Sequence, residues 1–268
     1  MGRWVSGTLT LAIGLSALAA CGPSGRPGGE GGRASSRSQA QAAYRPPPQV
    51  TSVVLAPDGR IRLEGVADPN QQTRLDAPGG PVALAKADRS GRWRATLAAA
   101  SGVRLLGLSM SDHGHVIHSQ GYLALAPDGT AAQLRAGAGS LSVGPPRGPL
   151  ALLALDFDRR GAAVVSGRAG TRGEVQIAVD GVSVGRTTPG ADGRFSLDLP
   201  SPLPPGLHSL AILQGALRMA VQVRLPELTA PAAGPFQAQA LGDAWLVTWV
   251  TPGGGVQGTL LFQAPRRS

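Results

Sequence analysis

Apolar residues alternate with polar or small residues in short runs over most of the chain beyond residue 50. The runs at residues 61–63, 93–97 and 195–199 show this pattern. A period of two places successive side chains on opposite faces of a strand, so the pattern predicts half-buried β-strands. Asp-Gly pairs at residues 180–181 and 192–193 are turn signals between such runs. The 39 Gly and 23 Pro interrupt long helices, and the predicted fold class is all-β.

Two parts of the chain repeat each other without a gap. Residues 61–65 (IRLEG) match residues 163–167 (AVVSG), and residues 90–93 (SGRW) match residues 192–195 (DGRF), so the offset is 102 in both cases. Beyond these matches the second copy gains two residues within its Pro-rich loop at 201–205. Each copy holds about seven candidate strands, which is the content of a small β-sandwich. The sequence therefore predicts a duplicated sandwich.

The second copy carries the motifs IAVDGVSVG, ADGRFSLDL and PGLHSL, which end at residues 185, 199 and 210. This arrangement resembles the bacterial Ig-like modules of cell-envelope proteins. The resemblance implies an Ig-like module at 150–226 and a second one at 50–128, where Pro81 departs from the pattern by standing in place of Ser183. Residues 129–149 are assigned as a linker, and an added strand is the alternative left open.

A third apolar segment, residues 235–264, is predicted to form a C-terminal β-hairpin. Trp245 and Trp249 alternate with Val247 along one face of its first strand. An isolated hairpin is marginally stable in water, so this segment should pack on the second module or on a partner. Because the two indole rings look exposed, they are the candidate residues for partner docking.

The start of the chain has the features of an export signal. Arg3 precedes an apolar run at residues 5–17, which is too short to span a bilayer and is typical of a signal peptide covering residues 1–20. The sequence LAACG at residues 18–22 resembles the bacterial lipobox. The resemblance implies lipidation of Cys21, the single Cys of the chain; an ordinary signal peptide with a chance Cys is the alternative.

Gly22 stands where an Asp would favour the inner membrane in the Gram-negative version of that family. The lipobox therefore implies an outer-membrane anchor facing the periplasm. Several acyl chains would hold the protein to the membrane without a spanning segment. Residues 21–49 are rich in Gly, Ser, Pro, Arg and Gln, a composition typical of a disordered tether.

The net charge of +9 at pH 7 permits an anionic partner. Lys86 is the only lysine among 25 basic residues, a skew that the coding bias of a GC-rich genome would also produce. Arg92 and Arg94 flank Trp93 and are predicted to point to solvent. Such a surface could meet an anionic glycan or an acidic envelope protein. Nucleic acid is excluded as a partner for an exported, lipid-anchored protein.

Three short motifs are candidates for a catalytic or metal-binding site. Residues 181–185 (GVSVG) have the spelling of a nucleophile elbow but no helix-forming sequence after them. His113 and His115 would share one face of a strand while His118 would point to the other, so three ligands would not converge on a metal. Residues 156–158 (DFD) lack the further ligands of a Ca²⁺ loop. We predict no catalytic site, no cofactor and no metal.

These observations together predict a non-enzymatic, lipid-anchored protein of the bacterial cell envelope. Its role would be structural or adhesive, with Ig-like modules presenting binding surfaces. The alternative is a periplasmic binding or assembly factor that docks an envelope partner through its C-terminal hairpin, by strand addition to an unpaired edge.

Overall fold

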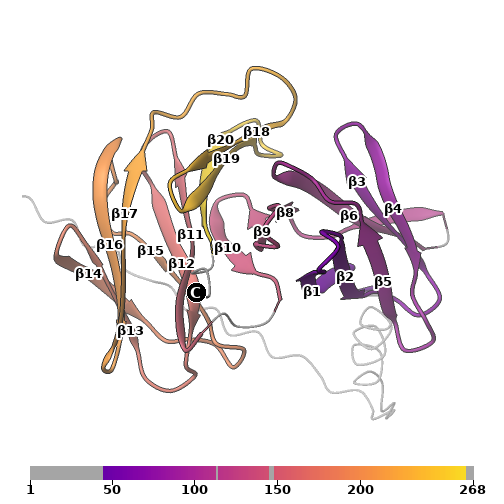
Figure 1. Cartoon of the computed structure of the whole chain (residues 1–268), viewed down its shortest axis with the longest axis horizontal. Helices are drawn as coiled ribbons and strands as arrows, with labels where there is room; N and C mark the ends of the chain where they lie inside the picture. Colours follow the sequence, from indigo (N-terminus) through magenta and orange to yellow (C-terminus); the bar gives the residue numbers. More distant parts are fainter. Residues whose placement is uncertain (1–44, 113, 145–147, 264–268) are drawn as a thin grey trace, which may run out of the picture. The chain divides into compact units, whose positions relative to one another are not determined.

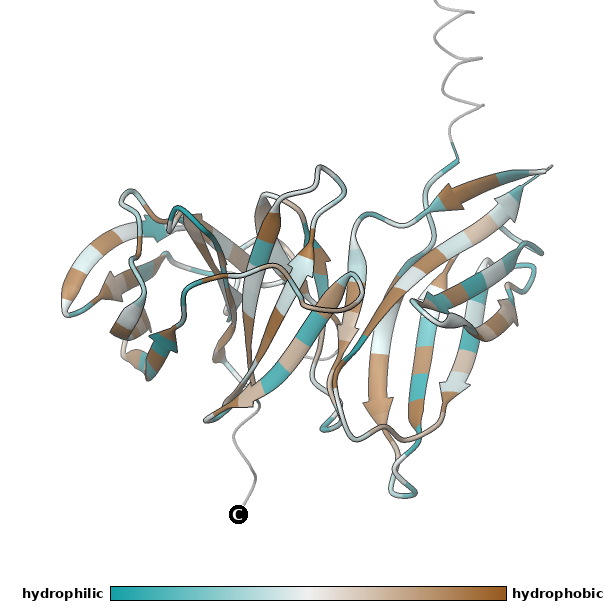
Figure 2. Ribbon diagram, turned by 90° about the horizontal axis from the view of Figure 1, so that it is seen from above, coloured by the Kyte–Doolittle hydropathy of each residue, from teal (hydrophilic) through white to brown (hydrophobic). Residues whose placement is uncertain are grey.

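The computed structural model describes residues 45–112, 114–144 and 148–263, and these residues form strands and turns without a helix. Apolar and polar residues alternate along most strands (Figure 2), as the sequence predicts. Within this described part, no helix has the length and apolar character needed to cross a bilayer.

The first module is a sandwich of two antiparallel sheets. One sheet has the order β1-β2-β5. The other contains the order β8-β6-β3-β4, with β4 at its edge, and β7 pairs with the far half of β6. The bounds are β1 Gln49–Leu55, β2 Ile61–Val66, β3 Gln72–Ala77, β4 Gly80–Lys86, β5 Arg92–Leu97, β6 Arg104–Asp112, β7 His115–His118 and β8 Tyr122–Leu125.

The second module repeats this topology (Figure 1). The order β11-β12-β15 corresponds to β1-β2-β5, and β17-β16-β13-β14 corresponds to β8-β6-β3-β4. The bounds are β11 Leu150–Asp158, β12 Ala163–Ala169, β13 Val175–Val179, β14 Val182–Thr187, β15 Arg194–Asp198, β16 Gly206–Gln214 and β17 Leu217–Leu225. The protein thus contains two tandem Ig-like β-sandwich modules, as predicted.

Strand register confirms the repeat residue by residue. Leu75 lies opposite Leu108 in the first module, and Ile177 lies opposite Ile212 in the second. The offset is 102 for the first partner of each pair and 104 for the second. This difference is the two-residue gain predicted for the Pro-rich loop.

A glycine packed under an aromatic ring explains the most similar positions of the two copies. Gly65 lies opposite Trp93, and Gly167 lies opposite Phe195. A Cβ on Gly65 would lie 2.3 Å from the Trp93 ring, and one on Gly167 would lie 2.6 Å from the Phe195 ring. The aromatic ring occupies the space that a side chain on the glycine would fill. The glycine and the aromatic residue opposite it are therefore both present in each copy.

Residues 129–149, assigned as a linker, contain two strands. These are β9, Ala131–Arg135, and β10, Ala138–Ser142. They continue the larger sheet of the first module in the order β10-β9-β8, so the alternative of an added strand is the one the structure supports. The reason is that β8 offers an unpaired edge that the chain itself fills.

The C-terminal segment forms the predicted hairpin and one further strand. The bounds are β18 Phe236–Leu241, β19 Ala244–Val250 and β20 Val256–Phe262. Strands β19 and β20 make the hairpin around the 251–255 turn. Because β20 pairs with β11, the segment extends the second module's sheet in the order β15-β12-β11-β20-β19-β18.

Candidate binding surface

The site residues predicted from the sequence lie in different environments. Cys21 lies outside the residues that the structure describes. Trp249 is fully buried and Trp245 is half-buried, so the expectation of an exposed Trp pair is wrong for Trp249. The alternation with Val247 places all three side chains on one face of β19, as predicted, but that face is covered.

The cover over β19 is the first module. An apolar cluster joins Leu105, Ala124 and Leu134 to Leu153, Val247, Trp249 and Leu261 across the two modules. The Tyr122 ring meets the Trp249 ring edge to face, with centroids 5.9 Å apart at 79°. The Trp249 indole N–H donates to Thr259 Oγ1 at 3.4 Å. Strands β11 and β20 are therefore buried on both faces, and Trp249 packs at the junction between the modules.

A buried carboxylate lies at the same junction. Asp156 on β11 is opposite Thr259 on β20 and is only 3% exposed. It accepts hydrogen bonds from the Ser140 N–H at 2.7 Å, the Ser140 hydroxyl at 2.8 Å and the Thr259 hydroxyl at 2.6 Å. The Gln257 amide donates to it at 3.3 Å. Burial raises the pKa of Asp156, although the donors around the carboxylate oppose that shift.

Gln257 links this cluster to the turn between β9 and β10. Its amide oxygen accepts from the Gly137 N–H at 3.1 Å, and its amide nitrogen donates to the Arg135 carbonyl at 3.3 Å. The predicted linker is thereby fixed to the second module by polar as well as apolar contacts. From the sequence, Asp156 was considered only as part of a rejected Ca²⁺ loop. The continuous apolar run before it was the signal that both faces of β11 are covered.

The candidate catalytic and metal-binding motifs of the sequence do not come together in one site. Ser183 is exposed on strand β14 and its hydroxyl accepts from the Gln176 amide at 2.9 Å. His115 and His118 are exposed at the two ends of β7, and His113 is outside the described residues. Among the residues that the structure describes, no group of three His, Cys, Asp or Glu could hold a metal ion.

His208, in the loop motif that ends at residue 210, has a structural role that the sequence did not reveal. Its Nδ1 lies 2.8 Å from Asp180 Oδ2 and its Nε2 lies 2.8 Å from the Pro204 carbonyl oxygen. Burial alone would lower the pKa of His208, but these two acceptors raise it overall. The same hydrogen bond and the Ser209 N–H, at 2.7 Å, lower the pKa of Asp180. The pair fastens the Asp180-Gly181 turn to strand β16.

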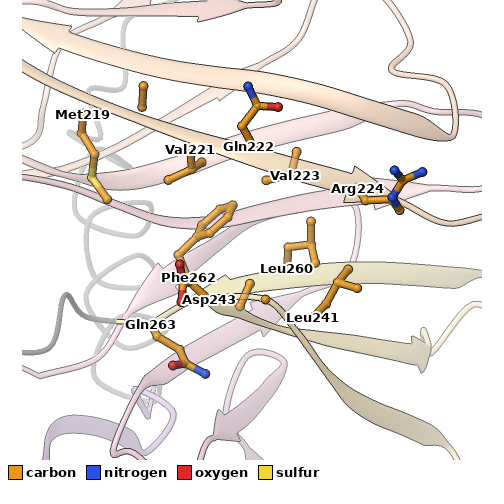
Figure 3. A pocket seen from close by; sticks show the side chains of 13 residues that line it. Met219, Val221, Gln222, Val223, Arg224, Leu241, Asp243, Leu260, Phe262 and Gln263 are labelled. Atoms are coloured by element: carbon orange, nitrogen blue, oxygen red, sulfur yellow. The ribbon is translucent and has the colours of Figure 1, made fainter.

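A groove runs along β17 of the second module (Figure 3). One wall is β17 from Met219 to Arg224, and the floor includes Leu260 and Phe262 of the opposite sheet. Leu241 and Asp243 lie at the far rim. The groove has a volume of about 770 Å³. It exists because the sheet with β20, β19 and β18 extends past the last strand of the sheet that faces it.

Comparisons with known proteins add a weak likeness. No family model matches the chain, and no curated protein matches it. The chain is similar to a solved structure described as the central fibronectin-III array of RIM-binding protein, with 13% identity, 80% of this chain and 88% of that chain covered, and a TM-score of 0.25. It is also similar to the BSP domain of a biofilm associated protein, with 13% identity, 69% of this chain and 30% of that chain covered, and a TM-score of 0.24. The fold assignment rests on strand order instead.

Proposed function

We propose that the protein is a non-enzymatic, lipid-anchored component of the bacterial cell envelope that presents two joined Ig-like modules to a partner. Cys21 is the lipidated residue and residues 21–49 are the tether. The groove along β17 is the observation on which the binding role rests, because it combines an apolar floor with a strand edge. An outer-membrane location facing the periplasm follows from the lipobox and Gly22.

The buried titratable side chains have structural roles, which supports a binding function over a catalytic one. Asp156 and His208, the two buried titratable groups with shifted pKa values described above, are both occupied by hydrogen bonds that hold elements together. Ser183 lies on a strand instead of a strained turn before a helix, so it lacks the context of an activated nucleophile.

The alternative is a periplasmic binding or assembly factor that docks an envelope partner through its C-terminal strands. Within the described residues, β18 pairs only with β19 and ends its sheet, so a partner strand could add beside it. Trp245, half-buried on the neighbouring strand, is the more exposed of the two indole rings and would be the one available to such a partner.

The anchor is tested by Cys21→Ser in the native host. We expect the variant to leave the membrane fraction or to accumulate as an unprocessed precursor, because the thiol is the acyl acceptor. Ser6→Ala, within the same leader, is the matched control and should be processed and retained like the wild type. Normal processing and membrane retention of Cys21→Ser would refute the anchor, and crosslinking in the intact envelope would then identify any partner independently.

A further inference from the structure

The two modules differ at one sheet edge. In the first module, β8 pairs with β6 on one side and with β9 on the other. In the second module, β17 takes the place of β8: Leu106 lies opposite Leu123, and the equivalent Leu210 lies opposite Val221. Among the described residues β17 pairs only with β16. The position that β9 fills in the first module therefore has no strand in the second.

Strand β17 also lacks a proline and a bulge, two of the features that protect an edge from pairing. It runs for nine residues without a Pro, and its register with β16 is continuous from Leu217 to Leu225. The corresponding segment of the first module is broken into β7 and β8 at Gly121, where the β9 backbone approaches so closely that a Cβ would lie 1.8 Å from the Leu134 carbonyl oxygen. An unbroken edge without bulges is a ready template for another strand.

We propose that this edge binds an extended segment of another protein by strand addition, and that the segment alternates apolar and acidic side chains. The inference rests on the proposed binding function and names its partner class. The backbone of the segment would pair with β17, and its apolar side chains would enter the groove over Leu260 and Phe262. At about 3.4 Å per residue, the six residues from Met219 to Arg224 would accommodate a segment of about six residues.

The alternation follows from the two faces of β17. Met219, Val221 and Val223 face the core of the module, whereas Arg218, Gln222 and Arg224 are exposed on the other face. Figure 3 shows Gln222 projecting away from the side of β17 on which Phe262 and Leu260 lie. A strand added beside β17 would place alternate side chains next to Arg218 and Arg224, where opposite charge is favourable.

A second copy of the chain fits this edge poorly. In a two-fold antiparallel pairing centred on Val221, Arg218 of each copy would lie opposite Arg224 of the other, and like charges directly opposite destabilise a pair of strands. In this register the charges of the edge favour an acidic segment over self-association.

The test uses the purified full chain and a capped, fluorescent heptapeptide of sequence AEVEVEA, with binding followed by fluorescence anisotropy. The wild type should bind AEVEVEA more tightly than the basic peptide AKVKVKA. The double variant Arg218→Glu and Arg224→Glu should reverse this preference, with a loss of about tenfold or more for AEVEVEA. The matched control, Arg62→Glu with Arg89→Glu, changes the net charge equally at exposed positions of the first module and should leave the preference unchanged.

A second peptide separates strand addition from simple charge attraction. AEVEVEA with alternate backbone nitrogens methylated keeps every side chain but loses half of its N–H donors, so it should not bind. Equal binding of the methylated peptide, or an unchanged preference in the Arg218 and Arg224 variant, would overturn the proposal. A dimer of the wild type in analytical ultracentrifugation that the same double variant abolishes would also overturn it, in favour of a second copy. None of these results depends on Cys21, so failure here is distinguishable from failure of the anchor.

Discussion

Removal of the buried carboxylate at the module junction should loosen the junction before it unfolds either module. In Asp156→Ala, the Ser140 N–H and the side-chain donors of Ser140, Thr259 and Gln257 lose their common acceptor. An unsatisfied buried donor costs about 1–3 kcal/mol. The hydroxyl groups can turn toward other acceptors, and removal of a buried charge offsets part of the loss. We therefore expect a decrease of about 2 kcal/mol in the free energy of unfolding.

The assay combines urea unfolding, followed by far-UV circular dichroism, with quenching of tryptophan fluorescence by acrylamide. Trp249 lies at the junction beside Thr259, so its quenching should increase in Asp156→Ala at urea concentrations where the circular dichroism is still native. Asp198→Ala, at an exposed position of β15, is the matched control and should change neither signal.

The raised pKa of Asp156 fixes how its contribution to stability changes with pH. Burial raises the folded-state pKa of Asp156 above its ordinary value of 3.8, so the folded state binds more protons than the unfolded state between the two values. The wild type should therefore lose stability relative to Asp156→Asn as the pH rises from 3.8 through the raised pKa. A relative gain of stability over that range would refute the reasoning, because it would mean that the hydrogen bonds outweigh burial. Unchanged unfolding and quenching in Asp156→Ala would refute the junction role itself.

Two further predictions concern the second module. Gly167→Ala should destabilise by about 1–3 kcal/mol in urea unfolding, because its Cβ would lie 2.3 Å from the Ala151 carbonyl oxygen; the loss should persist with Phe195→Leu, and an unchanged midpoint would contradict the packing. The wild type should be more stable than His208→Gln below pH 6.5 and should lose this advantage as the pH rises through the raised pKa. A thermal-unfolding difference that stays constant between pH 5 and pH 9 would exclude this contribution of His208.

Local patterns in the sequence predicted much of the fold. Period-two alternation identifies a strand because side chains of a strand point to opposite faces, and Asp-Gly pairs mark turns because they tolerate positive φ, which Asp180 and Gly181 adopt. The offset of 102 between Gly65 and Gly167 identified the duplication, since each glycine must leave room for an aromatic ring on the next strand. These features depend on neighbours along the chain or on one adjacent strand.

The candidate site depended on contacts that the sequence alone does not specify. The alternation of Trp245, Val247 and Trp249 defines an apolar face but not the surface that covers it, and the tertiary structure covers it with the first module. In the sequence, Asp156 is an ordinary polar residue of a strand. Only the tertiary structure shows that β10 lies across it. Likewise, the regular pattern of β17 is the same for a central strand and an edge strand. Only the pairing of the sheets decides that β17 ends its sheet beside a groove, because pairing depends on segments far apart in the chain.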